Sequence, residues 1–426
     1  MSKDKHYTIR DSSNISKTKK IILGIQHTFT MFGATVLVPI ITGLDISVSL
    51  FLAGVGTLIF HFITKRKIPA FLGSSFAFIA PMLAVLALKT GITDVAEALS
   101  NGQGAQVAEG LAYARGGIVV AGLIYLILAV LIYFFGIEKI IKFFPPVVTG
   151  PIIIVIGLKL APTAIDMASN HWGLAIISFL IVTIVSVFAK GFLKVVPVII
   201  GLIGGYIVAV FIGNVDFTPI TIAPVYGLPK FALPKFDFST IMIVAPIALA
   251  TMIEHIGDVL AIGSTVERDF IKDPGLHRTL VGDGVATAVS AMFGGPANTT
   301  YSENTGVLAL TRVWDPLIMR IAAIFAIILG LSPKLGAVIS TIPTAVIGGI
   351  SIVLFGMIAA IGARTLVENQ VDFTSSRNLI IAAVILVLGL GGATLPIKLG
   401  RLDFTLEGMA LAAIIGIILN KLLPTE

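Results

Sequence analysis

The 426-residue chain contains no cysteine, which excludes disulfides, thiolate metal ligands and cysteine nucleophiles. Charge is also scarce, because Asp, Glu, Lys and Arg make up 12% of the residues, against about 25% in a typical soluble domain. No His, Asp or Glu spacing matches a zinc site, and no Walker-type glycine-rich loop is present. We therefore expect no metal, no cofactor and no ATP drive. Since no nucleophile–base pair can be placed either, we predict that the protein is not an enzyme.

Hydrophobic residues dominate instead, at 56% of the chain, with a mean hydropathy of +1.03. Many apolar runs of spanning length predict a polytopic, all-α protein of the lipid bilayer, without a removable signal peptide. The excess of positive charge, +6 in total, lies mainly in the loops on one side of the predicted membrane topology. We attribute it to membrane orientation and expect no nucleic-acid partner. The sequence predicts fourteen segments, at about 21–42, 47–63, 70–88, 117–136, 147–161, 173–189, 195–213, 240–263, 280–293, 297–311, 316–332, 337–362, 378–392 and 406–423.

Basic residues are distributed unevenly between the two sides of this topology. With the N-terminus inside, twenty Lys and Arg residues fall on the inner side and eight on the outer side. Because cytoplasmic loops carry the excess of Lys and Arg, this bias predicts that both termini are cytoplasmic. We interpret residues 1–20 as a flexible cytoplasmic tail, and the polar stretches 89–116 and 214–239 as solvated external loops.

Fourteen segments divide into seven plus seven, and an odd number per half makes the two repeats inverted. We place the first repeat at 21–213, an external linker at 214–239 and the second repeat at 240–426. Gln26 and Ser75 are 49 residues apart, as are Glu254 and Glu303. Segments 3 and 10, at 70–88 and 297–311, thus fall at matching places in the two halves.

Both of these segments are short and rich in Gly, Pro, Ser and Thr at their starts. The stretch 294–312 is polar and carries Glu303 where a spanning segment is due. Irregular backbone at membrane depth survives only where it is buried in protein or lines a wet cavity. The two broken segments are therefore a candidate binding site, although an ordinary loop stays open as an alternative.

Three acids fall at mid-membrane positions, each at a cost of about 2.5–3.5 kcal/mol. Glu254 and Asp258 share one helix face, and Glu303 lies in the second broken segment. Their clustering suits a site where protons and a polar ligand meet, because neighbouring carboxyl groups titrate as a coupled set. The alternative is a hydrogen-bonded cluster that only holds helices together. Free N–H groups of a short helix opened by Asn304, together with the ring of Phe76, suit a small planar heterocycle.

At these residues the chain resembles the nucleobase–ascorbate (nucleobase–cation symporter 2) transporter family, and within it the bacterial uracil permeases. The family signature matches at every fixed position of the run from Glu303-Asn304 through Gly306 to Thr311-Arg312. The Gln26-His27 pair, the Glu254-His255 pair and the 67–76 run are also similar.

The resemblance implies segments 3 and 10 built as a short strand plus a half-helix. It also implies a core domain (21–136 with 240–332) and a gate domain (137–213 with 337–423). It further implies substrate binding by Phe76, Glu254, Tyr301, Ser302 and Glu303. From the clustering of the acids we predict proton coupling by Glu254, Asp258 and Glu303, with His27, Ser75 and Asn304 as candidate supporting residues. Two positions depart from some uracil permeases, which have His in place of Asp258 and Gly in place of Ser302. His27 either lines the site or orients a neighbouring helix.

We therefore predict a multi-pass symporter of the cell membrane that takes up uracil with protons as the coupling ion. A carrier of xanthine, urate or another nucleobase is the nearest alternative. An anion transporter or channel of the sulfate-permease type, which shares the fold, is a more distant one. A homodimer is the candidate assembly.

Overall fold

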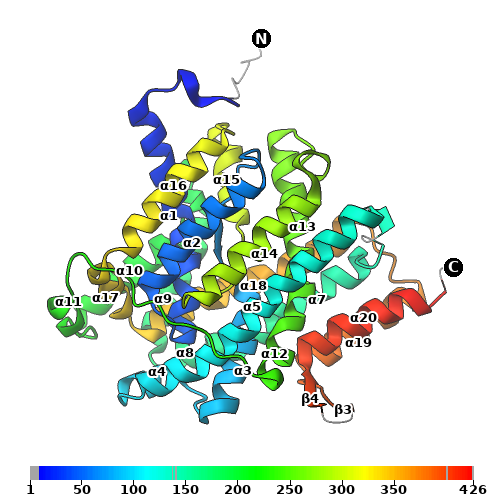
Figure 1. Ribbon diagram of the computed structural model, residues 1–426. Helices are drawn as coiled ribbons and strands as arrows, with labels where there is room; N and C mark the ends of the chain where they lie inside the picture. Colours follow the sequence, from blue (N-terminus) through cyan, green and yellow to red (C-terminus); the bar gives the residue numbers. More distant parts are fainter. Residues whose placement is uncertain (1–8, 137, 140–141, 400–401, 425–426) are drawn as a thin grey trace.

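The computed structural model describes residues 9–136, 138–139, 142–399 and 402–424. Residues 1–8 of the expected tail lie outside this range. The described part is predominantly helical, and its helices run mainly between two opposite faces of the molecule (Figure 1). The first half of the chain forms η1 (Ser12–Asn14), α1 (Lys17–Thr42), α2 (Ile46–Ile63), β1 (Leu72–Ser74), η2 (Phe76–Phe78), α3 (Ile79–Thr90), α4 (Val95–Ser100), α5 (Gly104–Phe135), α7 (Pro146–Lys159), α8 (Ala161–Ser169), α9 (Trp172–Phe188), η3 (Gly191–Val195), α10 (Pro197–Phe211) and α11 (Thr218–Ile222).

The second half begins with a broken helical segment and repeats the strand-then-helix pattern of β1 and α3. It forms α12 (Phe238–Val244), η4 (Ala245–Ile247), α13 (Ala248–Val266), η5 (Ile271–Gly275), α14 (Leu276–Met292), β2 (Asn298–Thr300), α15 (Ser302–Thr311), α16 (Pro316–Gly330), α17 (Pro333–Ser340), α18 (Thr344–Glu368), α19 (Ser376–Leu390), β3 (Thr394–Leu399), β4 (Leu402–Glu407) and α20 (Gly408–Leu422).

Helix boundaries follow local capping chemistry. Asp45 accepts a hydrogen bond from the N–H of Val48 and starts α2, and Asp315 does the same for Leu317 at the start of α16. Pro316 occupies the first turn of α16, where a missing N–H costs nothing. At the other end of a helix, Gly91 adopts a left-handed conformation and ends α3.

Among the described residues, six helical segments are long and apolar enough to cross a membrane, and a seventh candidate is the pair α16–α17, which is bent by 80°. Five shorter apolar helical segments accompany them in the described part of the chain. The strand-plus-half-helix form expected for segments 3 and 10 is present, as β1 with η2 and α3, and as β2 with α15. The arrangement of fourteen crossings in two inverted repeats stays a prediction.

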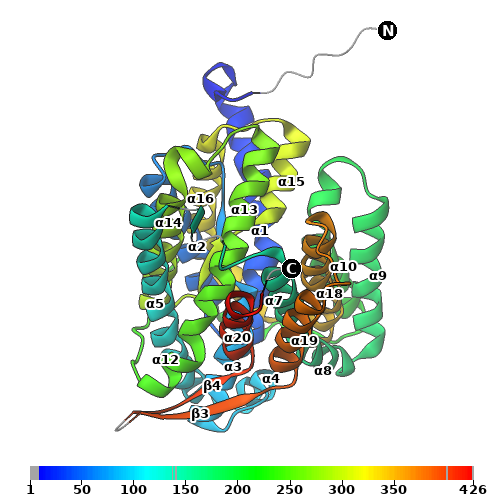
Figure 2. The same cartoon turned by 90° about the vertical axis from the view of Figure 1, so that its right-hand side faces the viewer.

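The helices pack into two groups, which lie side by side in Figure 2. We call the set α1, α2, α3, α5 and α12–α16 the first helix group, and the set α7–α10 and α18–α20 the second helix group. In the first group α14 packs on α5 and α2, and α16 packs on α2 and α1. In the second group α18 packs on α7, α8 and α9, and α19 packs on α7 and α20.

Three sequence-based expectations are wrong. Stretch 89–116 is not a loop throughout, because α5 begins at Gly104, and its buried Arg115 donates hydrogen bonds to the carbonyl groups of Ala232 and Leu233. Segment 12 is two helices, α17 and α18, interrupted just before Thr344. The fold is not purely α-helical, since β3 and β4 form a hairpin between α19 and α20 (Figure 1).

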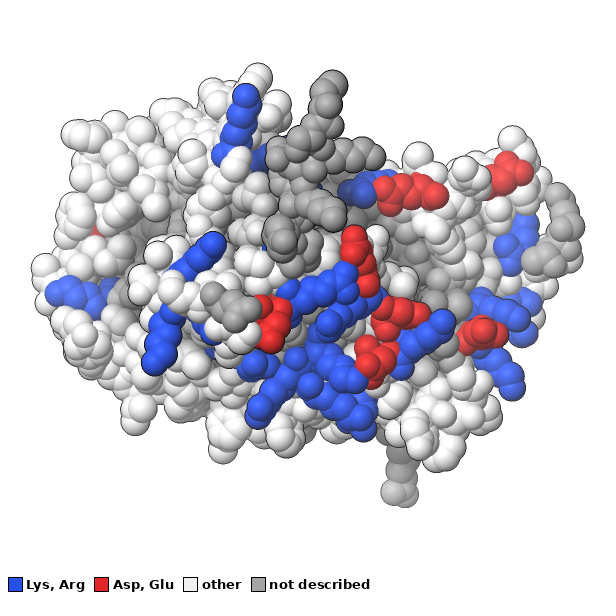
Figure 3. Space-filling view, turned by 90° about the horizontal axis from the view of Figure 1, so that it is seen from above, with Lys and Arg blue, Asp and Glu red and all other residues white. Residues whose placement is uncertain are grey.

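The expected tail also differs from the prediction within its described part. Residues 9–16 contact the connection between α15 and α16, and α1 already begins at Lys17, where the side chain of Ser16 caps the helix. Lys and Arg side chains gather on the face of the molecule seen from above (Figure 3), the same face over which the N-terminal segment lies. This gathering agrees with the uneven distribution of basic residues between the predicted loops.

Candidate functional site

The two broken segments meet in a short antiparallel ladder. Leu72 pairs with Thr300, Gly73 with Thr299 and Ser74 with Asn298. Two flanking bonds extend the ladder, since the N–H of Tyr301 donates to the carbonyl of Phe71 at 3.0 Å and that of Ser75 donates to Ala297 at 2.9 Å. All six strand positions are buried. Backbone groups that cannot reach water are thereby satisfied where the helices stop.

Tyr301 holds this crossing together. Its hydroxyl donates to the carbonyl of Ser74 at 2.9 Å and accepts a longer bond, 3.4 Å, from Thr35. A Cβ atom at Gly73 would come within 2.5 Å of the Tyr301 ring, so a side chain cannot be added there without displacing it. The predicted site residue Tyr301 is thus a buried contact between β1, α1 and the start of α15.

The three predicted acids lie together beside the ladder. Glu254 and Asp258 are half-buried on α13, and Glu303 stands in the first turn of α15. Asp258 accepts a hydrogen bond of 2.9 Å from the hydroxyl of Thr300 in β2. Glu254 interacts electrostatically with both other carboxylates. The structure therefore brings the acids of two separate helices to one place.

Glu303 is exposed to a cavity of about 50 Å³ that lies between the two helix groups. One wall is formed by Thr30 and Ala34 of α1, and the opposite wall by α9, the start of α10 and α18. A larger cavity of about 460 Å³ separates Ile256 and Gly257 of α13 from the second group. The cleft between the groups is therefore open beside the helices that carry the acids.

The predicted supporting residues are in contact. The side-chain amide of Asn304 donates to the backbone carbonyl of His27 at 3.3 Å and lies 3.2 Å from Nδ1 of the same residue. Both residues are buried, so this contact fastens α15 to α1. The Ser75 hydroxyl is buried and has no hydrogen-bond partner among the described residues, which leaves it available to a ligand.

Phe76 is half-buried and faces the second helix group. Its ring meets that of Phe355 of α18 edge to face, with the centroids 6.1 Å apart and the planes at 74°. The backbone of Ser302 forms the first position of α15. The predicted residues therefore divide into buried contacts, His27, Tyr301 and Asn304, and residues beside the open cleft, Glu254, Asp258 and Glu303.

A fourth intramembrane acid was missed. Asp283 of α14 is fully buried, and its Oδ2 lies 3.3 Å from Nδ1 of His255, which is equally buried. It also interacts electrostatically with Glu254 and Asp258. The prediction of three such acids was wrong, because Asp283 lies between Gly282 and Gly284 in an apolar segment and carries the same insertion cost.

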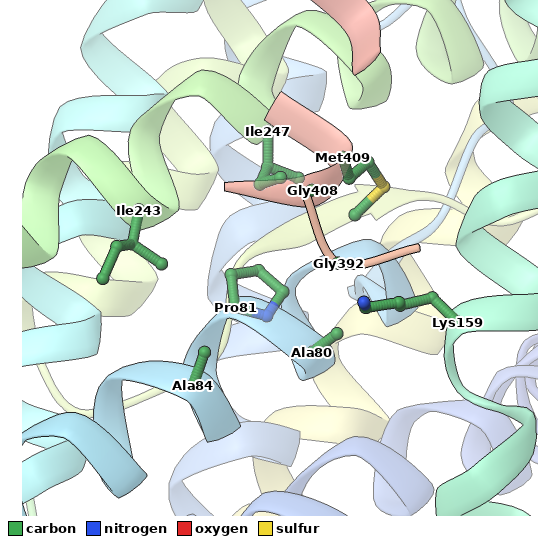
Figure 4. Close-up of a pocket in the computed structure, with 9 residues that line it drawn as sticks. All are labelled: Ala80, Pro81, Ala84, Lys159, Ile243, Ile247, Gly392, Gly408 and Met409. Carbon is green, nitrogen blue, oxygen red and sulfur yellow. The ribbon is translucent and has the colours of Figure 1, made fainter. Parts of the chain in front are cut away.

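A further cavity, of about 90 Å³, lies away from the acids (Figure 4). Pro81 and Ala84 of α3 face Lys159 of α7 across it, and Gly392 and Gly408 beside the β3–β4 hairpin close one side. The described residues hold no group of three or more His, Asp or Glu side chains that could bind a metal ion.

Two segments that pair through short strands and bring carboxylates together beside an open cleft have the form of a substrate site in a membrane transporter. The Permease family model matches residues 18–398. The chain is 44% identical to a probable uracil permease of Haemophilus influenzae, over 97% of this chain and 96% of that protein. It is 44% identical to the uracil permease of Bacillus caldolyticus, over 95% and 92% respectively. The chain thus belongs to the permease family of nucleobase–ascorbate transporters.

A solved structure shares the fold. The transmembrane domain of the cyanobacterial bicarbonate transporter BicA aligns with a TM-score of 0.64, covering 97% of this chain and 99% of that domain at 16% identity. At this level of identity the likeness concerns the fold alone. The match to the Permease family and to the near full-length uracil permeases shows that the protein is a permease and not an enzyme, as the sequence predicted.

Proposed function

We propose that the protein takes up uracil across the cytoplasmic membrane together with protons. The single observation that carries the proposal is the convergence of Glu254 on α13 and Glu303 on α15 beside an open cleft. Support for the substrate comes from the near full-length relatives, which are named uracil permeases.

The chemistry of uracil matches the groups at this place. Its ring presents N–H donors and C=O acceptors along its edge. Carboxylates of Glu254 and Glu303 accept from the N–H groups, and such charged hydrogen bonds are stronger than neutral ones. Tyr301 does not cap α15 with its side chain, so the N–H group of Ser302 in the first turn donates to a carbonyl oxygen of the ligand. Phe76 contacts the ring face.

Proton coupling follows from the same carboxylates. Neither Glu254 nor Glu303 forms an ion pair with Lys or Arg in the part of the chain that the structure describes. Neighbouring acids without a permanent cation exchange protons as a coupled set. Asp258, one turn along the same helix face and electrostatically coupled to Glu254, shares in carrying the proton.

The first helix group acts as the core domain and the second as the gate domain, so that the substrate crosses when one moves against the other. The face on which Lys and Arg gather (Figure 3) is the cytoplasmic one. In this orientation the cavity beside Gly257, which also contacts Lys142 and Asn369, opens inward. Fourteen spans, inverted repeats and a homodimer remain parts of this proposal.

Radiolabelled uracil uptake into proteoliposomes tests the proposal. An imposed inward proton gradient should accelerate uptake, and dissipating the gradient with an ionophore should remove the acceleration. Uptake that ignores the gradient would rule out symport while leaving uracil as the substrate. A competition panel of xanthine, urate, thymine and bicarbonate separates the alternatives, because a purine or anion that displaces uracil fully would reassign the substrate.

A further inference from the structure

The N-terminal segment Ile9–Ser16, which we call the strap, lies across the connection between α15 and α16. Ile9 forms a parallel bridge with Val313. The N–H of Ile9 donates to the carbonyl of Arg312 at 2.9 Å, and the N–H of Trp314 donates to the carbonyl of Ile9 at 2.8 Å. The strap therefore adds backbone pairing directly after the half-helix that carries Glu303.

Ser12 anchors the strap. Its hydroxyl and its backbone N–H both donate to Oδ2 of Asp315, at 2.6 and 2.8 Å, and Ser12 is fully buried. Burial alone would raise the pKa of Asp315, but the hydrogen bonds from Ser12 and Leu317 and the charge of Arg320 together hold that pKa below its usual value. A buried apolar cluster of Ile15, Leu23, Val313 and Ile318 lies beside this anchor.

Arg10 reaches a second helix. Its Nη2 lies 2.7 Å from Oε2 of Glu267, the residue that ends α13 in a left-handed conformation. The same guanidinium group lies 5.3 Å from the centre of the Trp314 ring, and the Trp314 indole N–H donates to the carbonyl of Leu308 in α15. One side chain thus connects the ends of α13 and α15.

The end of α13 has few other restraints on its cleft side. Gly257, Leu260, Ala261 and Ser264 follow one another along one face of the helix, and all four are exposed. Side-chain packing therefore does not hold this face against the second helix group in the cytoplasmic half. A helix is stiff over such a length, so a restraint at Glu267 is transmitted to Glu254, about 20 Å away along the axis.

We propose that Arg10 is a positioning residue for the substrate site: with Ser12 as its anchor, it favours one spacing of α13 and α15, and hence of Glu254 and Glu303. This inference rests on the proposed function insofar as the two acids bind the substrate. Arg10 is 42% exposed and Glu267 is 72% exposed, so the ion pair is a weak, adjustable contact rather than a rigid one.

A charge swap tests the pair. Arg10→Glu should weaken uracil binding, measured by calorimetry on the purified full-length protein, by about two- to fivefold, the range expected for an exposed ion pair. The double variant Arg10→Glu/Glu267→Arg should recover the wild-type Kd. Arg364→Glu is the matched control, because Arg364 pairs with Glu368 at 2.6 Å on an exposed surface of α18, and it should leave the Kd unchanged. Wild-type affinity in Arg10→Glu, or failure of the swap to restore it, would overturn the inference.

A second readout needs no substrate. Because the chain has no cysteine, spin labels at Ala261→Cys and Ala309→Cys report the distance between α13 and α15 directly. Arg10→Glu should shift or broaden this distance distribution, and the double variant should restore it; an unchanged distribution contradicts the inference. Arg10→Gln replaces Arg10→Glu if the latter does not fold. Should the distances respond while the wild type fails to bind uracil, the proposed substrate is wrong and the positioning role stands.

Discussion

The hydroxyl of Thr300 donates a hydrogen bond of 2.9 Å to the carboxylate of Asp258. This bond joins the second strand of the central ladder to the helix that carries two of the acids. The paired strands and α13 are therefore one unit, and the position of Asp258 depends on a side chain in β2 as well as on its own helix.

Thr300→Val should lower uracil uptake and the thermal stability of the purified protein, because the change keeps the shape of the side chain but removes its donor. A hydrogen bond to a charged group contributes about 1.5–3 kcal/mol. Thr299→Val is the control, since the Thr299 hydroxyl is buried without a hydrogen-bond partner among the described residues. Equal losses in the two variants would show that the bond to Asp258 has no special importance.

Glu254→Gln and Glu303→Gln should each weaken uracil binding by at least about tenfold, because an amide replaces a charged acceptor. Calorimetry measures the loss, and size-exclusion chromatography checks that the variants fold. Glu368→Gln, at an exposed position of α18, should bind uracil as the wild type does. Undiminished binding in either site variant would remove that residue from the proposed site.

Phe76→Ala and Phe355→Ala should have different effects although their rings touch. Phe76 precedes α3 in the core and is proposed to contact the ligand, so its loss should raise the Kd. Phe355 belongs to α18 of the second group, so its loss should change the uptake rate with a Kd within about threefold of the wild type. Aromatic pairs contribute about 0.5–1.5 kcal/mol. A larger Kd effect at Phe355 than at Phe76 would reverse the assignment.

Gly73→Ala should destabilise the protein by about 1–3 kcal/mol, because the added methyl group meets the Tyr301 ring at 2.5 Å. Thermal unfolding in detergent measures the change. Gly356→Ala on α18 is the matched control, since nothing lies within 4 Å of a Cβ atom there, and it should be neutral or stabilising. A stable Gly73→Ala variant would mean that the crossing of the two segments tolerates expansion.

The anchor of the strap should depend on pH through Asp315. Its pKa is lowered in the folded protein, so the carboxylate contributes stability at neutral pH, and this contribution is lost as the pH falls from about 4 through the folded-state pKa. Asp315→Asn should therefore be less stable than the wild type at pH 7, and the difference should shrink in acid. A difference in melting temperature that stays constant from pH 7 to pH 3 would contradict this account.

Much of the site followed from local sequence. Gly and Pro at the starts of two segments marked the breaks, and the cost of burying Glu254, Asp258 and Glu303 selected three of the four acids. Ser75 and Glu303, which end the two 49-residue spacings, both lie just after the paired strands, while the inverted repeat itself stays a prediction. These signals are local, because each one is a polar or helix-breaking residue inside a single apolar segment.

Other features depend on tertiary contacts that no single segment reveals. The strap is polar and short, and distant residues, the 312–315 connection and Glu267, give it a place. The extra helical turns of α5 carry Arg115, whose carbonyl partners lie in the distant linker. The β3–β4 hairpin has a local signal, since apolar and polar residues alternate around Ile397 and around Phe404. This signal is short and lies between two stronger helical patterns.

The ladder between β1 and β2 is made of main-chain bonds alone. The main-chain pairing itself does not involve the side chains of Glu303 or Phe76, so we expect the two half-helices to move as one unit whichever residues stand at those two positions. We expect that replacing Glu303 or Phe76 changes the substrate that is bound without changing the pairing of β1 with β2. A few substitutions beside the β1–β2 ladder should therefore be enough to change the substrate specificity of the protein.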